Sequence, residues 1–258
     1  MKLPSLLIFD FDGVIVDGMD EYWRSSRSAC INLFKGHVDP NSLPLEVPES
    51  FVELRPCVQH GWEMVLLAAE LLREDGPLRA QGASEFAESY LRYCNEALKF
   101  WGMEPVVFQD ALENARRSAI VADKNAWFAL HKPYSWVLDR CPQFASERVD
   151  WAVLTTKGSE FAAELLNYFG LSPNNIYGHE SGSKIDVLQK ISEEFLIQGF
   201  IEDRRLTLEA VLASSKLPSI PCYLASWGYL KPLDKENLPK GIFLLSPEIM
   251  SAPLASWV

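Results

Sequence analysis

Two aspartates separated by one residue, Asp10 and Asp12, are the side chains most suited to chemistry. They follow an apolar run over residues 6–9 that is typical of a buried strand. Residues two apart in a strand point to one face, so both carboxylates would converge at its carboxyl end, where open α/β sheets bind ligands. Like charges held close oppose each other's ionisation unless a cation or proton transfer compensates. The pair indicates a magnesium site, a nucleophile with its acid/base, or both; alone it also fits an ordinary Asp-Gly turn.

A second apolar run, over residues 151–154, ends in Thr155, Thr156 and Lys157, and an amphipathic run over 160–169 follows. This pattern predicts a strand, a tight loop and a helix. A loop at the start of a helix can bind an anion through its backbone N–H groups. The two threonines are therefore candidates for phosphate binding, although a threonine at this position is more often a helix cap.

A lysine, Lys184, opens a helical pattern over residues 185–195. A cation at the start of a helix opposes the helix dipole, and a bound phosphate would remove that conflict. Lys157 is the competing lysine, because it is basic and follows the second apolar run. We favour Lys184 because its helix leads into the last acidic strand.

That strand is an apolar run over residues 199–201, and it ends in Glu202 and Asp203. Mg²⁺ takes oxygen ligands and usually keeps several waters, so these acids, Asp10 and the backbone carbonyl of Asp12 would suit it. Asp203 is the preferred direct ligand. Alone, an acidic pair before two arginines is simply a charged helix start.

In this order the four segments resemble the motifs of the haloacid dehalogenase superfamily, in its phosphatase branch of phosphoglycolate phosphatase-like and β-phosphoglucomutase-like proteins. The resemblance implies that Asp10 attacks phosphorus and becomes an aspartyl phosphate, while Asp12 protonates the leaving group and later activates water. It also implies that Thr155 and Lys184 hold the phosphoryl oxygens. The presence of Asp12 favours phosphoryl transfer over dehalogenation, because the dehalogenases lack this acid/base.

The resemblance further implies a Mg²⁺ cofactor bound by Asp10, Asp12, Asp203 and Glu202. Glu202 matches the acidic-pair variant of some members, in which it binds the metal directly or through water. Thr207 stands where a later acid occurs in the commoner form of the last motif, so the sequence identifies no third acidic ligand there.

The long segment after the first motif has a helical pattern, with no comparable set of short apolar strands. It predicts helices over residues 22–34, 62–72, 83–100 and 107–130, the last with a break, and a proline-rich loop over 40–56. Such an insertion is similar to the helical cap of many members of the superfamily. We therefore expect a doubly wound, parallel-sheet, Rossmann-like α/β core (residues 1–18 and 132–258) with an inserted α-helical cap (19–131). The hinges would lie near residues 16–18 and 131–133.

Two further segments are weaker candidates. Arg55, in the expected cap, could offer a bidentate fork to a carboxylate or second phosphate, although an arginine paired with a surface acid is more common. The loop Trp227-Gly228-Tyr229 resembles a late loop near the active site in some related phosphatases; buried aromatics would look the same.

Composition limits the possible partners. A formal net charge of −11 disfavours binding to nucleic acid or to an anionic membrane surface. Five scattered cysteines lack metal-ligand spacing and indicate reduced thiols in a cytoplasmic or similar compartment. The apolar start is short and predicts a core strand rather than a signal peptide, and no apolar run is long enough to cross a membrane.

These observations predict a Mg²⁺-dependent phosphatase that hydrolyses a small phosphorylated metabolite, as a monomer or homodimer. A phosphomutase or phosphotransferase with the same aspartyl phosphate is the enzymatic alternative. A noncatalytic ligand-binding member of the fold is the alternative from another class. The identity of the phosphate ester is left open, because specificity in this superfamily lies in the cap.

Overall fold

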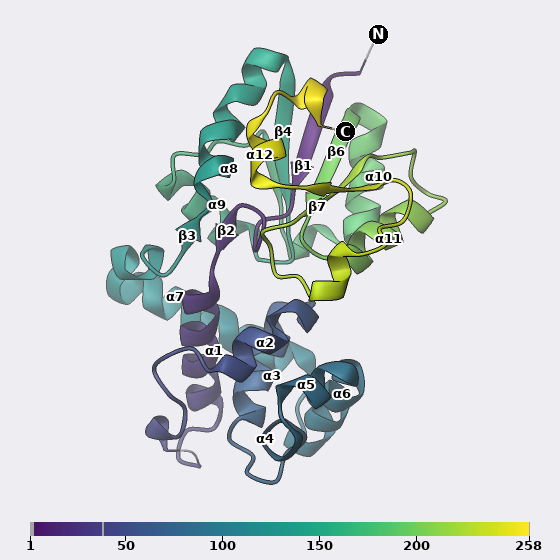
Figure 1. Ribbon diagram of the computed structural model, residues 1–258. Coiled ribbons are helices and arrows are strands. Elements are labelled where there is room, and N and C mark those ends of the chain that lie inside the picture. The colour runs from purple at the N-terminus through teal and green to yellow at the C-terminus, as the bar shows by residue number, and fades with distance from the viewer. Residues whose placement is uncertain (1–2, 38, 258) are drawn as a thin grey trace. The chain divides into compact units, whose positions relative to one another are not determined.

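The computed structural model describes residues 3–37 and 39–257. They form two compact units (Figure 1): a core unit, from the start of the chain to Asp17 and from Lys132 onward, and a helical unit, Gly18–His131. The chain passes between the units through two short strands of the core unit, β2 (Val16–Asp17) and β3 (Lys132–Pro133), which pair antiparallel. We refer to this pair as the β2–β3 ribbon.

The core unit is built on a sheet of six parallel strands in the order β5-β4-β1-β6-β7-β8. The strands are β1 (Ser5–Phe9), β4 (Val149–Leu154), β5 (Asn175–Tyr177), β6 (Leu196–Glu202), β7 (Cys222–Ala225) and β8 (Ile242–Leu245). The direction of winding reverses between β1 and β6, which makes this a doubly wound sheet with its ligand crevice expected at the carboxyl ends of those two strands. The predicted fold class is confirmed.

Helices cover both faces of this sheet (Figure 1). They are α8 (Ser135–Arg140), α9 (Ser159–Tyr168), α10 (Lys184–Glu194), α11 (Arg205–Ala213) and α12 (Pro247–Ser251). Alternate strand residues serve opposite faces: Ile8 packs with Leu188 and Leu208 of α10 and α11. Phe9 instead contacts the Phe144 ring, with a centroid distance of 5.9 Å. Strands covered on both faces explain the unbroken apolar runs of the sequence.

The helical unit has seven α-helices among its described residues, and no strand. They are α1 (Met19–Leu33), α2 (Glu49–Leu54), α3 (Gly61–Glu70), α4 (Pro77–Gln81), α5 (Ala83–Glu88), α6 (Tyr90–Trp101) and α7 (Pro105–Phe128). The predicted break in the last of them lies at Asp123, whose backbone is non-helical (φ −158°, ψ 96°). Its Oδ1 accepts a hydrogen bond from Ala126 N–H at 3.0 Å and so caps the helix where it resumes.

Two predictions for this unit were wrong in detail. The segment 40–56, predicted as a loop, contains α2, because Phe51 and Leu54 at helical spacing are both buried. The helix predicted over 83–100 is interrupted at Ser89, which separates α5 from α6. None of the described helices is both long and apolar enough to cross a membrane.

An ion pair buried within the helical unit joins its first and last long helices. Arg116 of α7 donates two hydrogen bonds to Glu21 of α1, from Nε to Oε1 at 2.8 Å and from the second guanidinium nitrogen to Oε2 at 2.9 Å. Ser25 donates a third, to Oε1 of the same carboxylate at 2.5 Å. Both charged side chains are almost fully inaccessible to solvent, so each compensates the buried charge of the other.

Candidate active site

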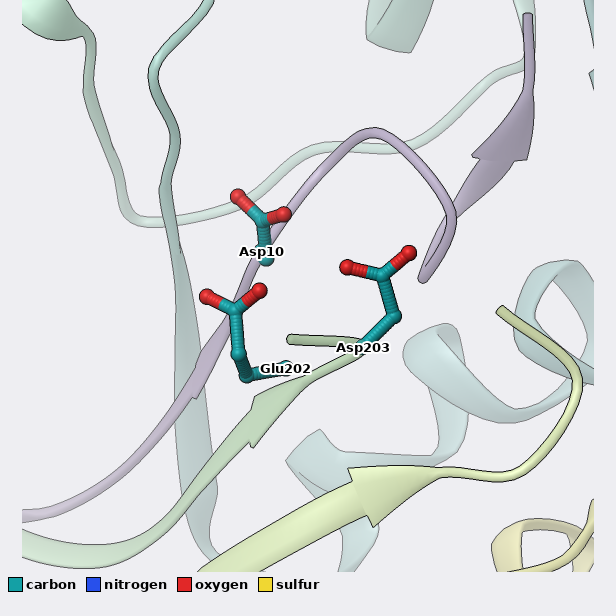
Figure 2. Close-up of side chains that lie close together, drawn as sticks. All are labelled: Asp10, Glu202 and Asp203. Atoms are coloured by element: carbon teal, nitrogen blue, oxygen red, sulfur yellow. The ribbon is translucent and has the colours of Figure 1, made fainter. Parts of the chain in front are cut away.

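The acidic residues of the first and last motifs lie side by side at the reversal point of the sheet. Asp10 directly follows β1, and its backbone N–H donates to the Ile201 carbonyl of β6 at 2.8 Å. Glu202 is the last residue of β6, and Asp203 follows it. Figure 2 shows the three carboxylates directed toward a common space. Two adjacent strands that each end in an acid thus produce the cluster.

This cluster has the donor set for a hard divalent cation. One carboxylate oxygen from each of Asp10, Glu202 and Asp203 lies within 4.8 Å of the others, and all three side chains are buried. Buried carboxylates need charge compensation, and Mg²⁺ prefers oxygen ligands. The residues present therefore fit Mg²⁺, while the contribution of the Asp12 backbone carbonyl stays a prediction.

Lys184 binds two members of the acidic cluster at once. It is the first residue of α10, and its Nζ lies 2.8 Å from Asp10 Oδ1 and 2.6 Å from Glu202 Oε2. Burial lowers the pKa of Lys184, but the two carboxylates outweigh burial and hold it above its ordinary value. Lys184 pairs with two of the three clustered carboxylates, and a bound cation would balance the remaining negative charge.

The electrostatics of the cluster act most strongly on Asp10. Burial, and then the neighbouring carboxylate of Glu202, raise the pKa of Asp10 to about 7, and the ammonium of Lys184 only partly opposes them. Without a bound cation, Asp10 is therefore partly protonated near neutral pH. A metal ion would favour the deprotonated form, which is the form that a nucleophile requires.

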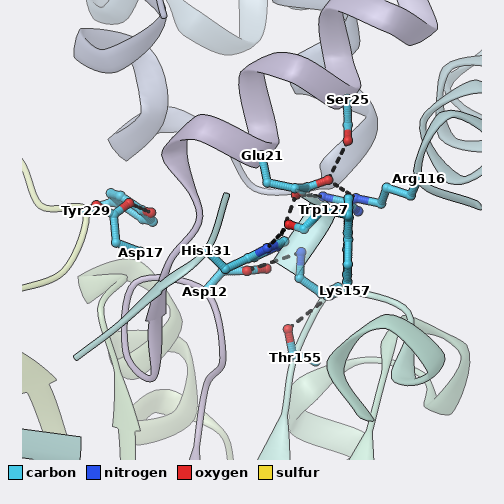
Figure 3. Close-up of polar contacts among 10 residues, drawn as sticks. All are labelled: Asp12, Asp17, Glu21, Ser25, Arg116, Trp127, His131, Thr155, Lys157 and Tyr229. Carbon is cyan, nitrogen blue, oxygen red and sulfur yellow. Dashed lines mark hydrogen bonds and ion pairs between the residues drawn. The ribbon is translucent and has the colours of Figure 1, made fainter. Parts of the chain in front are cut away.

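The second lysine considered in the sequence, Lys157, pairs with the other aspartate of the first motif (Figure 3). Its Nζ lies 3.3 Å from Asp12 Oδ1, and its backbone N–H donates to Thr155 Oγ1 at 3.0 Å. Thr155 and Lys157 are both buried, in the loop after β4. Because Thr155 Oγ1 accepts from a backbone amide, its hydroxyl proton is directed elsewhere and can donate to a phosphoryl oxygen. The sequence presented the two lysines as competitors, whereas the structure brings both to the site.

Two glycines permit the close packing around Asp203. Gly13 has φ +85°, and a Cβ there would lie 2.0 Å from Asp203 Oδ2. A Cβ on Gly228 would lie 2.2 Å from Asp203 Cβ. Only glycine leaves room for these two loops to approach the acid from both sides.

The loop that contains Trp227 and Tyr229 lies at this site. The backbone N–H of Tyr229 donates to Asp203 Oδ2 at 2.8 Å. Sequence reasoning proposed the segment only by resemblance and assigned it no contact. The sequence feature that could have indicated this contact is Gly228, which lies between two aromatic residues shortly after an apolar strand.

Two predicted substrate-binding residues, Thr156 and Arg55, are not part of the acidic cluster. Thr156 lies in the loop after β4 with an exposed side chain. Arg55 belongs to the helical unit, where its guanidinium lies 4.9 Å from the centroid of the Tyr22 ring. Contact of either residue with a substrate stays a prediction.

Comparison with solved structures finds the same fold in several phosphatase-type proteins. A predicted phosphoglycolate phosphatase from Haemophilus somnus 129PT aligns with a TM-score of 0.58 at 15% identity, covering 94% of this chain and 95% of that chain. A haloacid dehalogenase-like hydrolase from Streptococcus pneumoniae aligns at 0.54 and 12% identity, covering 95% of each chain. A predicted β-phosphoglucomutase from Thermotoga maritima aligns at 0.54 and 14% identity, covering 97% of each chain.

No family model and no curated protein matches the sequence. At such low identities, the structural likeness establishes the fold. The chain therefore has the haloacid dehalogenase fold, and the resemblance read from the motifs is confirmed at that level.

Proposed function

We propose that this protein is a Mg²⁺-dependent phosphatase that hydrolyses a small phosphate monoester through an aspartyl phosphate on Asp10. The observation that carries the proposal is the contact of Lys184 Nζ with both Asp10 Oδ1 (2.8 Å) and Glu202 Oε2 (2.6 Å), at the carboxyl ends of β1 and β6. A half-buried lysine that binds a candidate nucleophile beside a cation-binding acid is an arrangement suited to phosphoryl transfer.

In the first proposed step, a carboxylate oxygen of Asp10 attacks phosphorus and the bond to the ester oxygen breaks. Asp12 gives its proton to the departing oxygen, which leaves as an alcohol. In the second step, Asp12 accepts a proton from water, the water oxygen attacks phosphorus, and Asp10 is released as a carboxylate. The ion pair with Lys157 holds the Asp12 carboxylate in place between the two steps.

Two other residues of the core unit, Thr155 and Lys184, are proposed to bind the phosphoryl group during its transfer. Thr155 donates its hydroxyl to a phosphoryl oxygen, and Lys184 supplies positive charge to another. Asp10, Glu202 and Asp203, with the Asp12 carbonyl, would hold Mg²⁺. When bound, this cation balances the negative charge of phosphate and of the three carboxylates.

The helical unit is proposed as a cap that contributes substrate specificity through Arg55, and Thr156 of the core unit is a second candidate contact to the phosphate ester. A cap of this kind excludes bulk water from a reacting site, and its closure can gate catalysis. A reducing compartment such as the cytoplasm belongs to the same proposal, and the five cysteines, all buried and free of disulfides, support it.

The test is phosphate release from a panel of small phosphate esters, measured with Mg²⁺ and with EDTA, for the wild-type protein and Asp10→Asn. We expect metal-dependent release that the variant lacks. No release from any ester by the wild-type protein would contradict the proposal.

A phosphomutase is the second candidate, because a predicted β-phosphoglucomutase shares this fold along nearly the whole chain. It would use the same aspartyl phosphate but pass the phosphoryl group to a hydroxyl of a sugar phosphate instead of water. Isomerisation of a sugar phosphate without net release of phosphate would favour it.

A further inference from the structure

The loop over residues 226–230 connects the metal-binding acid to the ribbon that joins the two units. It follows β7, and the end of β8 fixes its start, because Ser226 N–H donates to the Leu245 carbonyl at 2.9 Å. Gly228 N–H donates back to the Ala225 carbonyl at 3.2 Å. The loop is thus a tight turn anchored to the sheet.

On one side, this loop is packed directly against Asp203. Tyr229 N–H donates to Asp203 Oδ2 at 2.8 Å. A Cβ on Gly228 would lie 2.2 Å from Asp203 Cβ and 2.8 Å from the Gly13 carbonyl oxygen, so there is no slack between the loop and the acid. A displacement of Asp203 must therefore be followed by Tyr229.

On the other side, the same loop contacts the chain on its way to the helical unit. The Tyr229 hydroxyl donates to Asp17 Oδ1 at 2.7 Å (Figure 3). Trp227 Nε1 donates to the Val14 carbonyl at 3.1 Å. Asp17 is the last residue of the core unit on this strand, and it pairs with Lys132 in the β2–β3 ribbon.

We propose that Tyr229 is a positioning residue that couples cation binding at Asp203 to the β2–β3 ribbon. Its backbone amide holds the acid and its hydroxyl holds Asp17, so one residue carries a change from the first to the second. Mg²⁺ bound at Asp203 would restrict the motion of the Tyr229 backbone amide and side chain, and through the Tyr229 hydroxyl that of Asp17 in the ribbon. Coupling of this kind is reciprocal, so a change in the ribbon would also alter the affinity for Mg²⁺. The inference rests on the proposed metal site and requires no turnover.

The test uses the full chain and two matched tyrosine variants. Tyr229→Phe removes the hydroxyl but keeps the backbone amide. Tyr223→Phe is the control, because the Tyr223 hydroxyl donates to the Trp257 carbonyl at 3.1 Å within the same unit. Isothermal titration with MgCl₂ measures cation binding. Hydrogen–deuterium exchange, with and without MgCl₂, measures protection of the ribbon amides of Val16, Asp17 and Lys132, which lie outside the proposed metal-binding loop.

In the wild-type protein and in Tyr223→Phe, we expect Mg²⁺ to slow exchange of the ribbon amides about fivefold or more, the lower end of usual coupling between sites. In Tyr229→Phe, we expect Mg²⁺ to bind while ribbon exchange stays unchanged. Asp17→Ala should reproduce this loss, and the double variant should add nothing further. Asp17→Asn keeps an acceptor oxygen and should retain protection.

Equal protection of the ribbon in Tyr229→Phe and in the wild-type protein would overturn the inference. So would a wild-type ribbon that does not respond although calorimetry detects Mg²⁺. Absence of calorimetric binding to the wild-type protein would overturn the proposed metal site, and this inference with it. Because no substrate is used, a failure of the phosphatase assay is a separate result.

Discussion

The ammonium of Lys184 lies 2.8 Å from Asp10 Oδ1, although 174 positions separate the two residues in the chain. The contact exists because β1 and β6 are neighbours in the sheet and α10, which leads into β6, begins beside their carboxyl ends. The same ammonium reaches Glu202 Oε2 at 2.6 Å. A single cation thus holds the candidate nucleophile against a candidate metal ligand.

Removing this cation should destabilise the core unit unless a metal replaces it. In EDTA, we expect Lys184→Met to lower the free energy of unfolding by about 3–5 kcal/mol, because two buried carboxylates lose their partner. Mg²⁺ should restore part of this loss, while activity stays low. Chemical denaturation followed by circular dichroism measures both.

The control is Lys216→Met, which breaks an exposed ion pair with Asp186 on the surface of the same unit. We expect little change from it with or without Mg²⁺. An equally small effect of Lys184→Met in EDTA would show that the buried ion pair is not needed for compensation.

Crowding around Asp203 predicts that Gly13→Ala abolishes Mg²⁺ binding. The added Cβ would lie 2.0 Å from Asp203 Oδ2, so the acid must move. Gly82→Ala is the matched control, because Gly82 also has positive φ (+90°) but nothing lies within 4 Å of its Cβ. Both substitutions place a side chain at positive φ, which strains the backbone by about 1–3 kcal/mol. Calorimetric titration should show normal Mg²⁺ affinity in Gly82→Ala alone; equal affinity in both variants would contradict the account.

The raised pKa of Asp10 predicts that Mg²⁺ binding depends on pH. This pKa is about 7, so the carboxyl is largely protonated at pH 6 and largely ionised at pH 8. A proton competes with the cation, so Mg²⁺ affinity should rise as pH rises through 7. In differential scanning fluorimetry, the same Mg²⁺ concentration should raise the melting temperature more at pH 8 than at pH 6. The Asp10→Asn variant should lose most of this pH dependence, and its persistence there would assign the titration to another group.

In the helical unit, two adjacent arginines of α7 should differ sharply in their effect on stability. Arg116 forms the buried ion pair with Glu21 (Figure 3), whereas Arg117 forms an exposed one with Glu113. We expect Arg116→Met to lower the free energy of unfolding of this unit by about 3–5 kcal/mol, since the buried Glu21 carboxylate loses both guanidinium hydrogen bonds and keeps the His131 imidazole, at 3.8 Å, as a neighbour.

Arg117→Met should change the same free energy by about 1 kcal/mol or less. Urea titration monitored by tryptophan fluorescence compares the two variants. Similar midpoints for Arg116→Met and Arg117→Met would contradict the assignment of the buried pair as a structural requirement.

Much of the fold could be predicted from the sequence, because several core strands appear there as a short apolar run followed by a polar residue. The apolar runs before Asp10, Thr155 and Glu202 are strands buried on both faces, and their carboxyl ends meet at one edge by the rules of parallel sheets. The sequence therefore predicted that these residues lie at one edge of the sheet, and the resemblance predicted that Asp10, Glu202 and Asp203 share a metal site.

What sequence reasoning missed depends on contacts between distant loops. It treated Lys157 and Lys184 as alternatives, because it could not assign each lysine to a different aspartate. The hydrogen bond from Tyr229 to Asp17 joins residues 212 positions apart, and no periodicity signals such a pair. The short helix α2 was not predicted because its segment is rich in proline. It is stabilised by the burial of two side chains, Phe51 and Leu54.

The central claim is that Asp10 becomes phosphorylated during turnover. The most direct measurement is acid quenching of the protein during reaction with an active phosphate ester and Mg²⁺, followed by mass spectrometry of the peptide that contains Asp10. We predict a phosphoryl group on Asp10 that hydroxylamine removes and that is absent with EDTA. Sustained Mg²⁺-dependent turnover by Asp10→Asn, with no phosphoryl group on this peptide in the wild-type protein, would contradict the account.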